Sequence, residues 1–186
     1  MGLLQRCKYW YLCNFAKPVA DRLLYKKLKN QAVQSIVEIG VGQGERIAAL
    51  AKVTALLRPE QKLRYTGVDL FEGRPDGAAG LELREAHRRF SGLGMKVQLA
   101  PGDAFSALAR LANSLAGTDW VFISADQDPA VVTKAMRYLP RMLSPTSIVF
   151  LEERGAAGEI VRYQELSLKE IEAKAATQAR AERRAA

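Results

Sequence analysis

Three glycines alternate with other residues directly after a short apolar run, and this spacing is typical of a ligand-binding turn. The apolar run is Ser35–Ile39, and the glycines are Gly40, Gly42 and Gly44. The following residues, Glu45–Ala51, have the pattern of a helix. A buried strand, a glycine turn and a helix N-terminus in this order form a site for a nucleotide-like ligand, because backbone N–H groups face the ligand and no Cβ obstructs its approach. Glu38, near the strand end, favours a ligand that carries positive charge.

Further acids follow other apolar runs along the chain. Asp69 ends one run, Asp103 follows the turn Pro101-Gly102, and Asp126 follows the run Trp120–Ser124. The carboxyl ends of parallel strands meet at one edge of a sheet, where such folds bind ligands, so we expect these acids to lie together. Asp69 suits a ribose, because a carboxylate can accept from two vicinal hydroxyls. Glu45 stands where a dinucleotide-binding fold keeps a small residue, which makes a dinucleotide oxidoreductase a distant alternative.

Strands alternate with helices over most of the chain. The predicted strands are Ser35–Ile39, Leu63–Val68, Lys96–Leu99, Trp120–Ser124, Ser147–Glu152 and one further strand at Glu159–Leu166. The predicted helices between them are Glu45–Leu57, Leu81–Phe90, Phe105–Leu115 and Pro129–Leu143. This alternation predicts an α/β fold: a Rossmann-like, doubly wound, mostly parallel sheet with helices on both faces. We expect a helical extension at 1–30, the sheet domain at 31–166 with trimmed C-terminal strands, and a charged helical tail at 167–186 that is exposed or frayed.

The order of these motifs resembles the class I S-adenosylmethionine-dependent methyltransferases. The resemblance covers about Ser35 to Glu153 and includes Tyr138–Pro145 before the last parallel strand. It implies S-adenosylmethionine as cofactor and a set of contacts to it. By this resemblance, Gly40, Gly42 and Gly44 pass beside the methionine part, which Glu38 supports; Asp69, with Leu70 next to it, holds the ribose; and Asp103 with the backbone of Ala104 binds the adenine.

The segment Ile123–Asp128 is similar to one in small-molecule O-methyltransferases and supplies the candidate catalytic residue, Asp126, as a base or substrate-orienting group. Ser124 replaces an acid that binds a divalent ion in metal-dependent members, and Gln127 replaces a histidine base. An alternative is a magnesium site made by Asp126, Glu152 and Glu153. Because of the departure at Ser124, we expect no metal.

The net charge of +8 is concentrated at the N-terminus. Residues 1–30 hold seven basic side chains against Asp21 alone. This excess indicates an acidic partner, either RNA or an anionic membrane surface, with a solvated helix face as the alternative. Two helices broken near Lys17-Pro18 are predicted. The aromatic cluster of Tyr9, Trp10, Tyr11 and Phe15 either caps the sheet over the substrate, which we favour, or lies at a lipid interface.

The remaining features set the cellular context. The sequence has no apolar run long enough for a membrane span and no signal-peptide pattern. Cys7 and Cys13 form neither a metal motif nor a disulfide framework. We therefore expect a cytoplasmic protein, with a peripheral position at a membrane surface as an alternative. The resemblance implies that it methylates an oxygen or nitrogen of a small or medium-sized acceptor. The alternatives are an RNA methyltransferase that uses the basic arm, and a non-catalytic methyltransferase-like module for interaction or membrane-surface binding. A homo-oligomer is left open.

Overall fold

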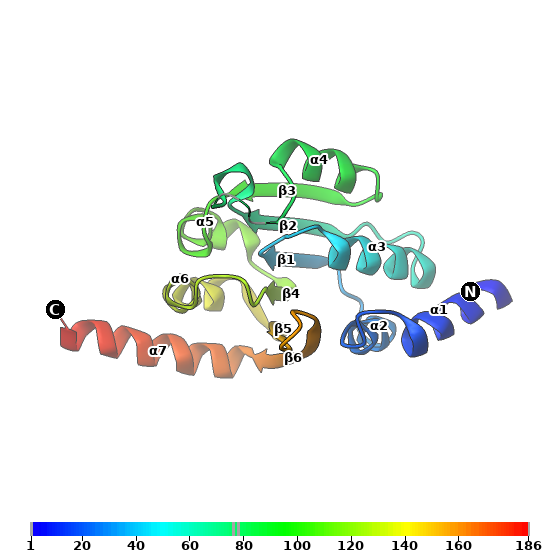
Figure 1. The fold of residues 1–186 in the computed structure, drawn as a ribbon. Coiled ribbons are helices and arrows are strands. Elements are labelled where there is room, and N and C mark those ends of the chain that lie inside the picture. Colours follow the sequence, from blue (N-terminus) through cyan, green and yellow to red (C-terminus); the bar gives the residue numbers. More distant parts are fainter. Residues whose placement is uncertain (1, 76, 78, 186) are drawn as a thin grey trace.

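A six-stranded sheet is the centre of the molecule. The computed structural model describes residues 2–75, 77 and 79–185, and its strand order is β3-β2-β1-β4-β5-β6 (Figure 1). The strands are β1 (Ser35–Ile39), β2 (Arg64–Asp69), β3 (Lys96–Pro101), β4 (Thr118–Ile123), β5 (Leu143–Arg154) and β6 (Ile160–Ser167). Neighbouring strands from β3 to β5 are parallel, and β6 pairs antiparallel with β5. The strand order reverses between β1 and β4, which is where doubly wound sheets bind ligands.

Helices connect the strands and flank the sheet. They are α1 (Leu3–Phe15), α2 (Asp21–Asn30), α3 (Glu45–Leu57), α4 (Leu83–Ser91), α5 (Ala104–Leu111), α6 (Pro129–Ala135) and α7 (Leu168–Ala185), with short 3-10 turns η1 (Phe71–Gly73), η2 (Ala112–Leu115) and η3 (Met136–Arg141). Side-chain hydrogen bonds fix the first residue of two of these helices. Asp103 caps α5 by accepting from Ser106 N, and Asp128 caps α6 by accepting from Ala130 N. The two terminal helices, α1 and α7, extend to opposite ends of the molecule (Figure 1).

The sheet buries a different apolar cluster on each face. One face carries the large rings of Tyr65, Trp120, Phe122 and Phe150, and it is covered by residues of α1 to α4. The other face carries smaller side chains, such as Val37 of β1, and it is covered by α5, α6 and α7. Successive strand residues point to opposite faces, so the continuous apolar runs of β1 and β4 are explained by burial on both sides.

The structure confirms the predicted fold class and corrects some of its boundaries. The single helix predicted at Pro129–Leu143 is wrong in its second half. The α-helix stops at Ala135 and continues as η3, which contains Pro140. Proline lacks an N–H and its ring displaces the preceding turn, so a regular helix cannot run through it. The predicted sixth strand is confirmed as β6.

The C-terminal segment is a helix, but its first turn is not exposed. Ile171 of α7 is 0% exposed and belongs to the second apolar cluster. Lys169 and Glu170 beside it face solvent. The expectation of an exposed or frayed tail is therefore wrong for this turn, because Ile171 and the partly buried Leu168 pack against the second apolar cluster.

Candidate functional site

Two cavities of similar size lie at different parts of the sheet. The first, about 260 Å³, is lined by the beginnings of β1, β2 and β3 together with η2. The second, about 270 Å³, is lined by the glycine loop after β1, the loop after β4, the end of β5 and the start of α2. Because their volumes are nearly equal, the chemistry of the lining must decide which one is the functional site.

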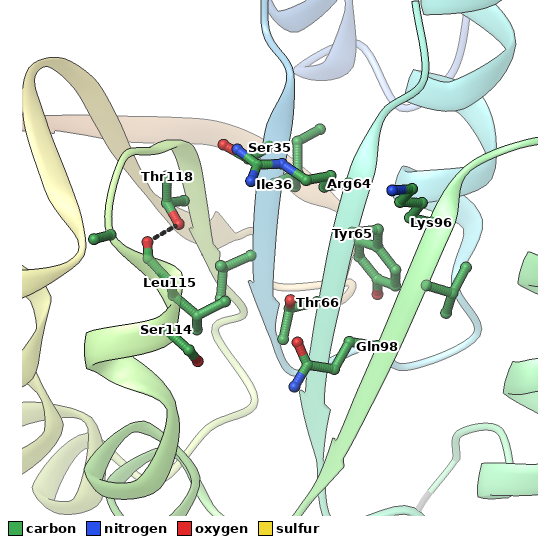
Figure 2. Close-up of a pocket in the computed structure, with 13 residues that line it drawn as sticks. Ser35, Ile36, Arg64, Tyr65, Thr66, Lys96, Gln98, Ser114, Leu115 and Thr118 are labelled. Carbon is green, nitrogen blue, oxygen red and sulfur yellow. Dashed lines mark hydrogen bonds between the residues drawn. The ribbon is translucent and has the colours of Figure 1, made fainter.

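The first cavity has a polar but unreactive lining. Figure 2 shows Thr66 and Gln98 on neighbouring strands, with Arg64 and Lys96 near the start of theirs. Thr118 is engaged locally, because its hydroxyl donates to the carbonyl of Leu115 at 2.7 Å. Among the described residues that line this cavity there is no carboxylate, cysteine or histidine. It is a gap between η2 and the beginnings of β1, β2 and β3, and its described lining has no side chain suited to acid–base or nucleophilic chemistry.

The second cavity collects the glycine loop and a set of charged side chains. The lining acids are Asp21, Glu38, Glu45, Asp126 and Glu152, and the lining bases are Arg46 and Arg154. Carboxylates therefore outnumber guanidinium groups here, although the whole chain has a net charge of +8. Opposite charges within a few ångströms attract strongly in a partly dry cavity, so this lining favours a cationic ligand.

The three glycines of the loop meet different constraints. All three have a positive φ. A Cβ on Gly40 would lie 2.7 Å from the Cβ of Ser124, so this glycine lets the β1 and β4 loops approach each other. A Cβ on Gly44 would lie 2.4 Å from the ring of Phe90, so this glycine is required by core packing against α4. A Cβ on Gly42 would meet nothing within 4 Å, so only here does the backbone face open space in which a ligand can lie.

A buried ion cluster forms the floor of the second cavity. Arg46, in the first turn of α3, donates to Glu38 at 2.9 Å and also pairs with Glu152. Its Nε donates to the Tyr163 hydroxyl at 3.1 Å, and that hydroxyl donates to Asp21 at 2.6 Å. The side chains of Arg46, Glu38 and Glu152 are 9%, 2% and 1% exposed. The cluster thus joins α2, β1, α3, β5 and β6 beneath the glycine loop.

Burial determines the protonation of this cluster. Burial raises the pKa of Glu38 to about 6, although Arg46 and the donating hydroxyl of Tyr65 act in the opposite direction. Burial also raises the pKa of Asp21 above its ordinary value, against the effect of Tyr163 and Arg46. The pKa of Arg46 is raised, because Glu38, Tyr163 and Glu152 outweigh the desolvation of its guanidinium. Arg46 is therefore a permanent cation, while the raised pKa of Glu38 is about 6.

A second guanidinium, that of Arg154, also lines the cavity. Arg154 Nε donates to Glu152 at 2.5 Å, its Nη2 donates to Ser124 Oγ at 3.3 Å, and Asp126 lies 4.0 Å away. Glu153 instead pairs with Arg162 at 2.6 Å and does not line the cavity. The alternative magnesium set of Asp126, Glu152 and Glu153 is therefore not brought together. Within the described part of the chain, no group of three or more His, Cys, Asp or Glu is placed to hold a metal.

Asp69 lies at the carboxyl end of β2, as predicted, but its carboxylate is fully engaged. One oxygen accepts from the backbone N–H groups of Val41 and Gly42 at 2.7 and 3.2 Å, and the other accepts from Phe71 N at 3.3 Å. Arg74 pairs with it at 2.8 Å. Asp69 is 5% exposed and does not line the second cavity. In this structure it holds the shape of the glycine loop, and its predicted contact with a ribose stays a prediction.

The remaining predicted residues stand at the neighbouring strand ends. Gly102 N donates to the carbonyl of Asp69 at 2.9 Å, which places Asp103 beside the end of β2. Hydrogen bonds from Ser106 and Phe105 backbone N–H groups hold the pKa of Asp103 below its ordinary value. Ala104 is buried in the first turn of α5, and Leu70 is 41% exposed. These residues lie along the same sheet edge as the cavity but not in its lining, and their adenine and ribose contacts stay predictions.

The sequence reasoning missed the residues that organise the cavity, above all Arg46 and Tyr163. One signal was present for Arg46. A cation in the first turn of a helix opposes the helix dipole, so it needs a nearby acid to be stable there. The identity of that acid was not visible, because Glu152 is 106 residues away along the chain.

Comparison with known proteins identifies the family to which the chain belongs. A model of a methyltransferase domain family matches residues 37–153, which span β1 to the end of β5. No curated protein matches the chain by sequence. A TehB-like SAM-dependent methyltransferase from Corynebacterium glutamicum has a TM-score of 0.50 and 15% identity, with 94% of this chain and 79% of that one covered.

Two other solved structures share the fold at the same level. A protein of echinomycin biosynthesis, described for the conversion of a disulfide bond into a thioacetal group, has a TM-score of 0.50 and 17% identity over 75% of this chain. MNMC2 from Aquifex aeolicus has a TM-score of 0.50 and 16% identity over 76% of this chain. The chain spans about half the length of these two, 50% and 49%. At such identities the likeness shows the fold alone, whereas the family model covers more than half of the sequence. The chain therefore belongs to the methyltransferase domain family.

Proposed function

We propose that this protein transfers a methyl group from S-adenosylmethionine to an oxygen or nitrogen of a small or medium-sized acceptor. The observation that carries the proposal is the second cavity, where a glycine loop with open space at Gly42 faces a surplus of carboxylates. The cofactor carries a sulfonium, an ammonium and one carboxylate, so its net positive charge matches the surplus of carboxylates in this lining. The residues present therefore fit the methyl donor.

The rest of the cofactor would lie along the neighbouring strand ends. The backbone at Gly40 and Gly42 and the first turn of α3 would hold the methionine part, while Asp69 and Asp103 would hold the ribose and the adenine. To bind the ribose, the Asp69 carboxylate must lose its ion pair with Arg74 and accept hydrogen bonds from the two ribose hydroxyls. Arg74 lies only five residues after Asp69, in the loop that follows η1, so a local movement is sufficient.

When bound, the cofactor supplies a methyl group on a good leaving group, and the protein must mainly hold the acceptor in line with it. Asp126 lines the cavity with its side chain 44% exposed, and it can take the proton that an acceptor hydroxyl or ammonium must lose. Arg154, 4.0 Å from Asp126, can orient an acceptor oxygen while Glu152 and Ser124 hold the guanidinium in place.

Isothermal titration with S-adenosylmethionine and S-adenosylhomocysteine tests the cofactor site. We expect binding by the wild type and at least a tenfold weaker affinity for Asp69→Asn, since the charged acceptor of the ribose hydroxyls is lost. Glu153→Gln is the matched control, because Glu153 carries the same charge but points to Arg162 on the surface. Absence of binding by the folded wild type would refute the proposal.

A turnover assay tests the chemistry separately. Release of S-adenosylhomocysteine is measured against a panel of phenols, carboxylic acids and amines. Removing a positioned base costs about 10²–10⁴-fold in rate, so Asp126→Asn should keep cofactor affinity and lose turnover by that factor. Tight cofactor binding without turnover on any acceptor would instead favour the non-catalytic alternative.

A further inference from the structure

The outer face of α1 is apolar and lies in solvent. The exposed fractions of Leu3, Leu4, Trp10, Tyr11 and Phe15 are 78%, 78%, 62%, 58% and 54%. Their spacing places them on one side of the helix, because residues three and four apart share a face. Phe15 contacts Trp10 and Tyr11, with ring centroids 5.6 and 5.5 Å apart. This surface, which we call the α1 aromatic face, packs on itself and not on the sheet.

The opposite side of α1 is the side that joins the domain. Cys13 is buried in the first apolar cluster, with Tyr9 and Leu12 partly buried against it. The Tyr9 hydroxyl donates to the carbonyl of Tyr25 in α2 at 3.0 Å. The expectation that the aromatic cluster caps the substrate is therefore wrong for Trp10, Tyr11 and Phe15. Only Tyr9 of the cluster turns towards the domain.

A basic groove runs beside the α1 aromatic face. A cavity of about 430 Å³ between α1 and α2 is lined by Arg6, Tyr9, Trp10, Cys13, Lys26, Lys29 and Asn30. Arg6, Lys26 and Lys29 supply three positive charges to it. Trp10 belongs to both surfaces, so the groove and the aromatic face are continuous. The acid of this segment, Asp21, is buried and bonded to Tyr163, so it does not offset these charges.

We propose that α1 and α2 dock the protein onto an anionic phospholipid surface. The α1 aromatic face enters the boundary between headgroups and acyl chains, and the groove of Arg6, Lys26 and Lys29 receives lipid phosphates. Interfacial helices combine these two features, with leucine and aromatic rings on one side and basic residues at its flanks. None of the helices in the described ranges has the length and apolar composition of a membrane span.

A lipid surface explains the residues better than RNA does. Basic grooves and exposed rings also bind single-stranded RNA, where bases stack on the rings. Leu3 and Leu4, however, are the most exposed of the large apolar side chains, and aliphatic groups gain nothing from stacking with bases. They gain free energy by leaving water for hydrocarbon. The inference does not depend on the proposed methyl transfer.

The test is binding of the full chain to vesicles, measured by co-sedimentation and by tryptophan emission. The vesicles contain phosphatidylcholine alone or phosphatidylcholine with phosphatidylglycerol. Trp120 is 0% exposed and should not respond, so any blue shift reports Trp10. We expect binding and a blue shift with the anionic vesicles only, and weaker binding as salt rises. The Trp10→Phe variant should still bind but lose the shift.

Two variants separate the apolar and basic contributions. Leu4→Asp/Phe15→Asp should abolish sedimentation, because two charges enter the inserted face. Arg6→Gln/Lys26→Gln/Lys29→Gln should bind on the order of a hundredfold more weakly, at a factor of about five for each basic residue near an anionic surface. The matched control is Arg84→Gln/Arg88→Gln/Arg89→Gln, which removes the same charge from exposed positions of α4. All changed side chains are exposed, so circular dichroism and melting temperature should stay unchanged.

Several results would overturn the proposal. One is no binding to anionic vesicles by the wild type, and another is equal weakening by the two triple variants. Tight RNA binding that Leu4→Asp/Phe15→Asp leaves intact, without vesicle binding, would assign the surface to nucleic acid. A dimer in sedimentation velocity that this variant dissociates, again without vesicle binding, would assign it to a second copy of the chain.

Discussion

Replacing Arg46 by methionine removes the cation at the centre of the buried ion cluster. Methionine keeps most of the volume, so the main loss is charge. Glu152 retains Arg154 at 2.5 Å, but Glu38 keeps only the hydroxyl of Tyr65 at 2.7 Å. Removing one partner of a buried pair leaves an uncompensated charge and costs about 3–5 kcal/mol. We expect a loss of that size in the free energy of unfolding near neutral pH, which is a large share of the stability of a small domain.

The loss should depend on pH in a defined direction. In the wild type the pKa of Glu38 is raised to about 6 from an ordinary value of 4.5, so the folded state favours its protonated form. Its contribution to stability is therefore fully present below the ordinary pKa and is lost as pH rises through about 6. The loss amounts to about 2 kcal/mol at about 1.4 kcal/mol per pKa unit. Without Arg46 the pKa of Glu38 rises further, so Arg46→Met should be less harmful near pH 5 than near pH 8.

Urea unfolding followed by circular dichroism measures this effect at both pH values. The control is the double variant Glu38→Gln/Arg46→Met, in which the side chain at position 38 no longer needs a cation. It should recover most of the stability near pH 8. A loss below about 1 kcal/mol near pH 8, or an equal loss at both pH values, would show that the cluster is not electrostatically coupled as we describe.

The remaining predictions concern packing and capping. Gly44→Ala should lower the free energy of unfolding by about 2–5 kcal/mol, because an alanine there would have a strained left-handed backbone and its Cβ would clash with Phe90. Unchanged urea unfolding would contradict this. Ile171→Ala should cost about 2–4 kcal/mol if α7 is docked as the structure shows, whereas a frayed tail would lose almost nothing. Asp103→Ala and Asp128→Ala each remove a helix cap and should cost about 1 kcal/mol. Only Asp103→Ala should also weaken S-adenosylmethionine binding in titration. If Asp103→Ala and Asp128→Ala changed the affinity equally, Asp103 would not belong to the cofactor site.

The order of elements and the edge of the sheet that carries the site follow from the sequence alone. The alternation of apolar runs with helical patterns is a local property, so each strand was predicted within a few residues except β5, which begins at Leu143. The glycine turn and the acids after each run are equally local. Parallel strands carry their carboxyl ends to one edge, so the sequence alone predicts that Gly40, Asp69, Asp103 and Asp126 lie along that edge.

Only the tertiary structure decided what each of these side chains contacts. Arg46 pairs with Glu38, Glu152 and Tyr163, two of which lie more than 100 residues away along the chain. The need for glycine at position 44 comes from Phe90 and not from a ligand. The α1 aromatic face is exposed because the opposite side of the same helix, with Cys13 and its neighbours, packs against the core. Burial and ion pairing depend on which segments meet in space, and helical or strand periodicity carries no information about that meeting.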